Sequence, residues 1–154
     1  MKILVVYGCG GHSAQANRLT SRLSNKENIE FFSITDKGEK PAWSICHIEV
    51  GEVRDKKNGS LKSLVKLPST IWAIYSFMKK NKIKNVLSTG PGVSLLVAVI
   101  SRVCRCKVIH IETWSRFYSL SLTGKAMRLM SIKILFQNKE LSKCLKNSQY
   151  VGRL

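Results

Sequence analysis

Residues 2–12 read KILVVYGCGGH, and this stretch decides the fold. Its first six residues are nearly all apolar or β-branched, which is typical of a strand covered on both faces of a parallel sheet. From Ser13 to about Ser24 the spacing of apolar residues becomes helical. Three glycines join the predicted strand to the predicted helix: Gly8, Gly10 and Gly11. Because glycines let a ligand approach the backbone and a helix N-terminus offers unpaired N–H groups, we predict an anion-binding loop.

This glycine loop matches none of the common phosphate-binding fingerprints completely. The dinucleotide pattern G-x-G-x-x-G would require glycine at Ser13, and a P-loop would require a lysine followed by Ser or Thr. A methyltransferase-like G-x-G-G pattern is satisfied. His12 falls where the helix begins, beside the expected ligand, and its imidazole can exchange a proton near neutral pH. From the loop alone, catalysis by His12 and simple capping of the helix both remain open.

The rest of the chain alternates predicted strands and helices. Its 154 residues, 44% of them hydrophobic, suffice for the core of one domain over residues 1–154. Strands are expected at 29–34, 45–50, 85–89, 107–112 and 132–137, and helices at 60–80, 93–104, 120–130 and 139–145. This alternation predicts an α/β fold with a Rossmann-like, doubly wound parallel sheet. Ligands of such sheets bind beyond the carboxyl ends of the strands, where the first glycine loop, STGPG (88–92) and ETWSR (112–116) are expected to meet.

Charge and composition narrow the function classes. The formal net charge is +17, from 26 Lys and Arg against 9 Asp and Glu, which favours anionic partners such as nucleic acid, phosphorylated metabolites or acidic lipids. Five cysteines without a CxxC pair and three histidines without ligand-like spacing predict neither a disulfide framework nor a metal site. No signal segment precedes the first strand, and the longest apolar run, 93–100, is too short to cross a bilayer. We therefore expect a protein of the reducing cytosol whose membrane contact is peripheral.

The predicted helix over residues 60–80 is the candidate for that contact. Its apolar sector is wider than one core contact needs, and lysines flank it, as in helices that lie in anionic headgroups. The residues expected to dock on the membrane are Lys66, Trp72, Tyr75, Lys79 and Lys80. Pro68 is expected to kink or divide the helix. A core helix with a solvated end would give the same pattern. Trp72 and Tyr75 could also stack on bases, but no RNA-binding signature is present and we expect no nucleic acid.

Five segments in order carry a resemblance to a known family: GCGGH (8–12), STGPGVSLL (88–96), VIHIETWSR (108–116), SLSLTGK (119–125) and YVGRL (150–154). Together they resemble the Alg14-like oligosaccharide-biosynthesis family. Its bacterial members are PssD/EpsE/CpsF-type glycosyltransferase subunits of capsule or exopolysaccharide assembly. The similarity extends over essentially the whole chain. It implies the N-terminal, acceptor-side half-domain of a split, MurG-like enzyme of the GT-B class.

The resemblance also implies a reaction and a partner. Family members take part in inverting transfer of a sugar from a UDP-sugar to a polyprenyl-diphosphate-linked saccharide at the cytoplasmic membrane face. A small C-terminal GT-B half-domain protein (Alg13/PssE-like) would bind the UDP-sugar donor, so this chain is expected to be inactive alone and to hold no cofactor of its own. Eukaryotic relatives carry an N-terminal membrane anchor that this chain lacks, which leaves the helix over 60–80 to dock on the anionic membrane surface.

Site residues follow from the same match. His12 matches the histidine of the family's first glycine loop and is predicted to be the general base. Glu112 matches the family's acidic residue after the later strand, and would orient the acceptor hydroxyl or act as the base; a surface carboxylate paired with Arg116 is the simpler alternative. Arg116 could hold a phosphate bidentately. Backbone donors for the diphosphate are expected at Gly10, Gly11, Gly90 and Gly92, although Pro91 between the last two has no N–H to donate.

Two other function classes remain at this point. One is a self-contained Rossmann enzyme that uses the G-x-G-G loop with S-adenosylmethionine or a nicotinamide nucleotide, and binding of either by the isolated chain would support it. The other is a basic nucleic-acid-binding module, which predicts steeply salt-dependent binding to RNA. The donor sugar, the linkage and the acceptor saccharide are not encoded in any of these motifs.

Overall fold

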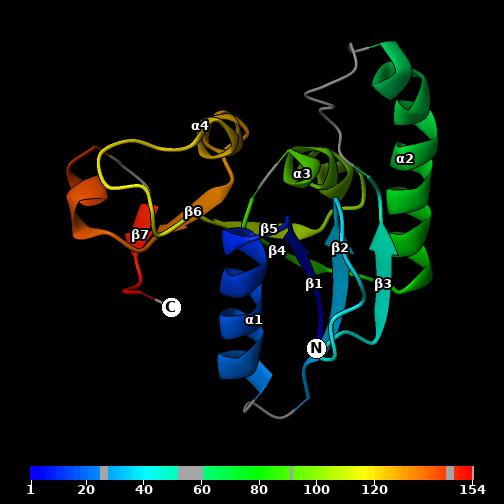
Figure 1. Ribbon diagram of the computed structural model, residues 1–154, viewed down its shortest axis with the longest axis horizontal. Coiled ribbons are helices and arrows are strands. Elements are labelled where there is room, and N and C mark those ends of the chain that lie inside the picture. The colour runs from blue at the N-terminus through cyan, green and yellow to red at the C-terminus, as the bar shows by residue number, and fades with distance from the viewer. Residues whose placement is uncertain (25–27, 52–60, 91, 145–147, 154) are drawn as a thin grey trace.

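The computed structural model describes residues 1–24, 28–51, 61–90, 92–144 and 148–153, without the side chains of 61–66 and 143–144. In these ranges one seven-stranded sheet has the order β3-β2-β1-β4-β5-β6-β7, and every neighbouring pair is parallel (Figure 1). The strands are β1 Lys2–Tyr7, β2 Glu30–Thr35, β3 Cys46–Glu49, β4 Asn85–Ser88, β5 Lys107–Ile111, β6 Lys133–Phe136 and β7 Ser148–Tyr150. The predicted parallel α/β fold is therefore confirmed.

Helices cover both faces of this sheet. They are α1 Gly11–Ser24, α2 Leu61–Lys80, α3 Val93–Val103, α4 Leu122–Leu129 and a 3-10 helix, η1, at Lys139–Cys144. Figure 1 shows α1 on the side of the sheet opposite α3 and α4. The chain moves outward from β1 to β3 and then returns to β4 on the other side of β1, so the direction of strand order reverses between β1 and β4. Ligand sites of doubly wound sheets lie at such a reversal.

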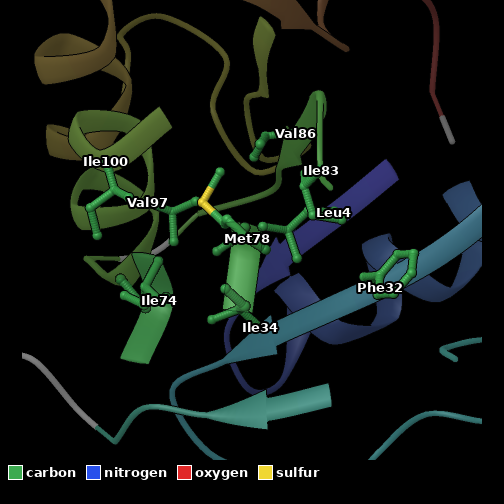
Figure 2. Close-up of a cluster of buried hydrophobic side chains, with 11 residues drawn as sticks. Leu4, Phe32, Ile34, Ile74, Met78, Ile83, Val86, Val97 and Ile100 are labelled. Atoms are coloured by element: carbon green, nitrogen blue, oxygen red, sulfur yellow. The ribbon is translucent and has the colours of Figure 1, made fainter. Parts of the chain in front are cut away.

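The apolar run at the start of the chain contributes side chains to the core on both faces of the sheet. Side chains of a strand alternate between faces. Even-numbered Leu4 and Val6 pack with Ile74 and Met78 of α2, while odd-numbered side chains of β1 pack with Ala16 of α1. Figure 2 shows residues of the sheet, α2 and α3 turned toward one another around Met78. A strand buried on both faces needs a continuous apolar sequence, and KILVVY supplies it.

Most predicted boundaries lie within two residues of the observed ones, and the short helix predicted near 139–145 is present as the 3-10 helix η1. Of the two outcomes expected at Pro68, division of the helix was wrong: α2 is one helix, in which Pro68 itself is exposed and the buried residues of the final turns pack on the core. The sequence also missed β7, because three residues at a sheet edge are too short to show a strand period.

Candidate functional site

The three predicted polar segments meet around one cavity at the carboxyl ends of β1, β4 and β5. The cavity has a volume of about 340 Å³, and its lining includes His12, Gly90 and residues 112–116. Two further lining residues, Ser121 and Thr123, come from the start of α4. Segments more than 100 residues apart in sequence are thus brought together, as the strand order requires.

His12 is held by the second glycine loop. It is the second residue of α1, and its ring Nδ1 is hydrogen-bonded to the carbonyl oxygen of Thr89. Because a carbonyl oxygen only accepts, Nδ1 carries the proton of the neutral ring. The lone pair of that ring then lies on Nε2, which is the form that a general base requires. The Thr89 hydroxyl also donates to the His12 carbonyl oxygen at 3.4 Å, so the two loops are tied at two points.

Gly90 provides the space in which the imidazole lies. Its φ is +103°, and a Cβ built on it would lie 2.7 Å from His12 Cε1 and 3.0 Å from Nδ1. Its own N–H donates to the hydroxyl oxygen of Ser88 at 3.5 Å, within the loop. Gly90 is therefore placed to support His12, and its predicted contact with a diphosphate stays a prediction. The other three predicted glycine donors are exposed, at the N-termini of α1 and α3: Gly10, Gly11 and Gly92.

We expect Gly90→Ala to lower the free energy of unfolding by about 2–4 kcal/mol, because the methyl group meets the His12 ring and the backbone must keep a positive φ. Urea denaturation measures this loss. Gly10→Ala is the matched variant, since Gly10 has φ +69° and no atom within 4 Å of its Cβ position. Gly10→Ala introduces the backbone strain alone and should lower the free energy of unfolding by about 1–2 kcal/mol. Equal losses in the two variants would contradict the close contact with His12.

Glu112 is buried at the end of β5, with 1% of its surface exposed. Its Oε1 accepts the N–H of Thr113 at 3.0 Å, and its Oε2 accepts both the N–H and the hydroxyl of Ser121 at 3.0 Å each. The interpretation of Glu112 as a surface carboxylate paired with Arg116 was therefore wrong, because the loop over 113–121 folds back and covers it. Arg116 is exposed at the rim of the cavity. Since donors occupy both carboxylate oxygens of Glu112, its geometry favours holding this loop over accepting a substrate proton.

Sequence reasoning missed the role of Ser121. Its hydroxyl oxygen accepts the N–H of Gly124 at 3.0 Å, which caps α4 at the N-terminus. There is no room for a side chain at Gly124, where a Cβ would lie 2.2 Å from Glu112 Oε2. The signal was present in the SLSLTGK segment, as a serine directly before a helix. Through Ser121, the carboxylate of Glu112 sets the start of α4 against the end of β5.

His110 lies buried beneath the second glycine loop. Its Nδ1 is 3.0 Å from the Ser88 hydroxyl oxygen, and within the described residues its Nε2 has no hydrogen-bond partner. Burial lowers the pKa of His110 from 6.5 to about 4; the charge of Glu112 opposes this shift and His12 adds to it. A protonated ring would place a second N–H in the interior without an acceptor, which is costly. His110 is therefore a neutral, structural histidine.

A pH-dependent stability follows from this burial. Between pH 6.5 and 4 the unfolded chain binds a proton at His110 that the folded chain does not, so stability is fully present above pH 6.5 and is lost as pH falls. We expect His110 to account for a loss of about 2 kcal/mol between about pH 7.5 and pH 5. Urea denaturation at both pH values measures it, with His110→Gln as the comparison. An equal pH dependence in the two proteins would contradict the assignment to His110.

The predicted docking residues lie on α2, away from this cavity. Trp72 is 69% exposed, Lys79 and Lys80 are exposed, and Tyr75 is partly buried between the Trp72 ring and the Lys79 ammonium group. Lys66 falls outside the described side chains. An apolar groove of about 610 Å³ runs between α2 and α3, lined mainly by Leu67, Ile71, Trp72, Tyr75 and Val103. In the described ranges, no helix is both long and apolar enough to span a bilayer.

Comparison with known proteins identifies relatives over the whole chain. The UDP-N-acetylglucosamine transferase subunit ALG14 of Homo sapiens is 28% identical over 179 residues, which covers 100% of this chain and 83% of the human protein. The subunit of the same name from Candida albicans is 26% identical over 176 residues, covering 99% of this chain and 78% of the yeast protein.

Solved structures share the fold at low sequence identity. Acinetobacter baumannii MurG superposes with a TM-score of 0.65 at 15% identity, over 88% of this chain and 40% of that one. The UDP-GlcNAc 2-epimerase of Methanocaldococcus jannaschii gives 0.65 at 16% identity, over 98% of this chain and 45% of that one. This chain thus spans less than half of either protein, and the likeness supports the GT-B-type, Rossmann-like assignment.

The family assignment rests on a separate comparison. The profile of the family described as "Oligosaccharide biosynthesis protein Alg14 like" matches residues 3–154. This match takes in all five segments on which the resemblance was based, including the loops that carry His12 and Glu112. The chain belongs to the Alg14-like family of oligosaccharide biosynthesis proteins.

Proposed function

We propose that this chain is the acceptor-binding, membrane-docking subunit of a two-component inverting glycosyltransferase. The enzyme transfers a sugar from a UDP-sugar to a polyprenyl-diphosphate-linked saccharide, in capsule or exopolysaccharide biosynthesis. The observation that carries the proposal is His12, whose ring is held by the Thr89 carbonyl with Nδ1 protonated at the edge of the cavity. Relatives named as UDP-N-acetylglucosamine transferase subunits make UDP-GlcNAc the first donor to test.

The reaction requires a base and a site for anions. As the acceptor hydroxyl attacks the anomeric carbon, His12 Nε2 takes its proton, the bond from that carbon to the UDP oxygen breaks, and configuration inverts. The acceptor's diphosphate lies against the exposed N-termini of α1 and α3, where Gly10, Gly11 and Gly92 offer backbone N–H groups, and Arg116 adds a cation. Glu112 holds the loop that carries Arg116.

A second chain supplies the donor site. We assign the UDP-sugar to a small C-terminal GT-B half-domain protein, Alg13/PssE-like, which faces the carboxyl ends of the strands of this chain. Support comes from the MurG and UDP-GlcNAc 2-epimerase structures described above, because this chain covers only 40% and 45% of them. The chain itself then needs no cofactor, and within its described residues no group of three or more His, Cys, Asp or Glu side chains is arranged to hold a metal ion.

Docking on the cytoplasmic membrane face brings the cavity to the lipid-linked acceptor. The exposed Trp72 and the apolar groove beside it would enter the headgroup region, and Lys79 and Lys80 would lie against anionic headgroups. Because this surface belongs to α2 and the cavity to the loops after β1, β4 and β5, docking and chemistry are separable by mutation.

We expect Trp72→Ala to weaken binding to phosphatidylglycerol-containing vesicles by about 30-fold, because a buried Trp side chain contributes about 2 kcal/mol. The double variant Lys79→Gln/Lys80→Gln should weaken it by a similar factor, at about 1 kcal/mol per lysine. Vesicle co-sedimentation measures both. Leu129→Ala is the matched control, since Leu129 is exposed on α4, outside the docking residues. Binding that is unchanged in both α2 variants would contradict docking through this helix.

The whole proposal is tested by reconstitution. The chain is co-expressed with a candidate half-domain protein encoded near it, and the purified complex is assayed with UDP-GlcNAc and a polyprenyl-diphosphate saccharide. Transfer by the complex, and by neither chain alone, is the expected result. A chain that takes no partner and binds S-adenosylmethionine, a nicotinamide nucleotide or RNA would contradict the proposal and favour one of the two other function classes.

A further inference from the structure

Three buried carboxamides converge on the loop that follows β5. Gln15 lies on α1, and Gln137 and Asn138 follow β6; their exposed fractions are 1%, 1% and 2%. The side-chain amides of Gln15 and Gln137 donate to the carbonyl oxygen of Glu112 at 3.4 and 3.0 Å. We call these three residues the amide clamp. None of them stands out in the sequence, and none is used by the mechanism proposed above.

Asn138 holds two further carbonyls of this loop. Its Nδ2 donates to the carbonyl oxygens of Trp114 and Arg116, at 2.6 Å each. Its Oδ1 accepts a hydrogen bond from the Arg153 guanidinium at 3.3 Å. The clamp therefore holds three alternate carbonyls, at residues 112, 114 and 116, and Arg153, in the segment after β7, holds Asn138 in turn.

This pattern fixes which way the peptide groups of the loop face. A trans peptide points its C=O and the next N–H in opposite directions, and the described chain has no cis peptide bond. With the carbonyl of Trp114 turned toward Asn138, the N–H of Ser115 points away from Asn138. Ser115 is exposed and lines the cavity, as does Arg116. The clamp thus fixes the backbone of the short segment that carries a backbone donor, the Ser115 N–H, and a cation, Arg116.

We propose that Asn138, supported by Gln15 and Gln137, is a positioning residue that presents the Ser115 N–H and the Arg116 side chain to the diphosphate of the acceptor. Asn138 does not touch the substrate. A loop held in one arrangement binds an anion without first being ordered, which strengthens binding. The proposal rests on the proposed function only for the identity of the ligand; the ordering of the loop is a property of this chain alone.

The first test is hydrogen exchange on the full chain. In the native loop the Arg116 N–H donates to the Thr113 carbonyl at 3.2 Å and the Thr113 N–H donates to Glu112 Oε1 at 3.0 Å, so these two amides are expected to be protected. Asn138→Ala should make the amides of Thr113 and Arg116 exchange about tenfold faster, while those of β1 are unchanged. Asn81→Ala is the matched control, because Asn81 Nδ2 donates to the Phe77 carbonyl at 2.9 Å, at the end of α2 and away from the cavity.

A second variant keeps the test decisive if Asn138→Ala does not fold. Arg153 is exposed, so Arg153→Met should fold, and it removes only the bond to Asn138 Oδ1 and the contact of the guanidinium with the Phe117 ring. Exchange of the Thr113 and Arg116 amides about threefold faster than in the wild type is expected from this smaller loss. Native exchange of the loop in every folded variant would overturn the proposal.

Transfer kinetics of the assembled enzyme separate positioning from mere stability. Arg153→Met and Asn138→Ala should raise KM for the lipid-linked acceptor, by up to about tenfold, and leave KM for the UDP-sugar unchanged. A purely structural role would lower the amount of active enzyme and leave both KM values native, which would overturn the proposal. If the wild-type complex transfers no sugar, the proposed function fails, but the exchange data still decide whether the clamp orders the loop.

Discussion

His12→Ala is expected to lower the rate of sugar transfer by the assembled enzyme by about 10²–10⁴-fold, the usual contribution of a general base. The hydroxyl of the acceptor is a very weak acid, so its attack depends on a group that takes the proton during the reaction. His12 is the histidine at the cavity, and the Thr89 carbonyl fixes its tautomer. The transfer assay with purified complex measures the loss, at saturating concentrations of both substrates.

A second substitution distinguishes the role of His12 as a base from its hydrogen bond to the Thr89 carbonyl. His12→Asn can keep a donor to the Thr89 carbonyl, since the Asn amide occupies nearly the place of the Nδ1 group, but it has no basic nitrogen. It should be as inactive as His12→Ala and closer to the wild type in stability. His47→Asn is the control, because His47 lies on β3 and bonds Ser33, outside the cavity. Near-native transfer by His12→Asn would show that another residue is the general base.

The fold could be predicted from the sequence because its main signals are local. The strand–glycine–helix stretch at 2–12 and the regular alternation that follows are read within windows of 10 to 20 residues or so. The strand order, with its reversal between β1 and β4, follows from the handedness of parallel crossovers and from the reversal that such folds share. The strand β7 was missed, because a strand of three residues shows no periodicity.

The candidate site could be predicted less completely, because its support is non-local. The sequence predicts that His12, Gly90 and residues 112–116 meet at one edge of the sheet, and the structure places all of them around one cavity. The sequence does not indicate which polar groups face inward. The amide of Gln15 bonds the carbonyl of a residue 97 positions away, and no local pattern predicts such a contact. The same holds for Glu112, whose position after a strand suggests exposure.

The burial of Glu112 leads to the second large effect. We expect Glu112→Ala to lower the free energy of unfolding by about 3–5 kcal/mol. The substitution removes the acceptor for two N–H groups and the Ser121 hydroxyl, and each donor left without a partner in the interior costs about 1–3 kcal/mol. It also leaves a cavity where Oε2 now lies close to Gly124. Urea denaturation of the chain measures the loss.

Stability and transfer together then decide what Glu112 does. If it holds the loop, Glu112→Gln should retain part of the stability, because one oxygen still accepts, and transfer should fall together with loop order. If it is the base, Glu112→Gln should abolish transfer while the loop and α4 stay native. Glu140→Ala is the control, since Glu140 is exposed on η1 and its loss should change stability by less than about 0.5 kcal/mol. Because three donors already occupy the carboxylate, we expect the first result, which leaves His12 as the base.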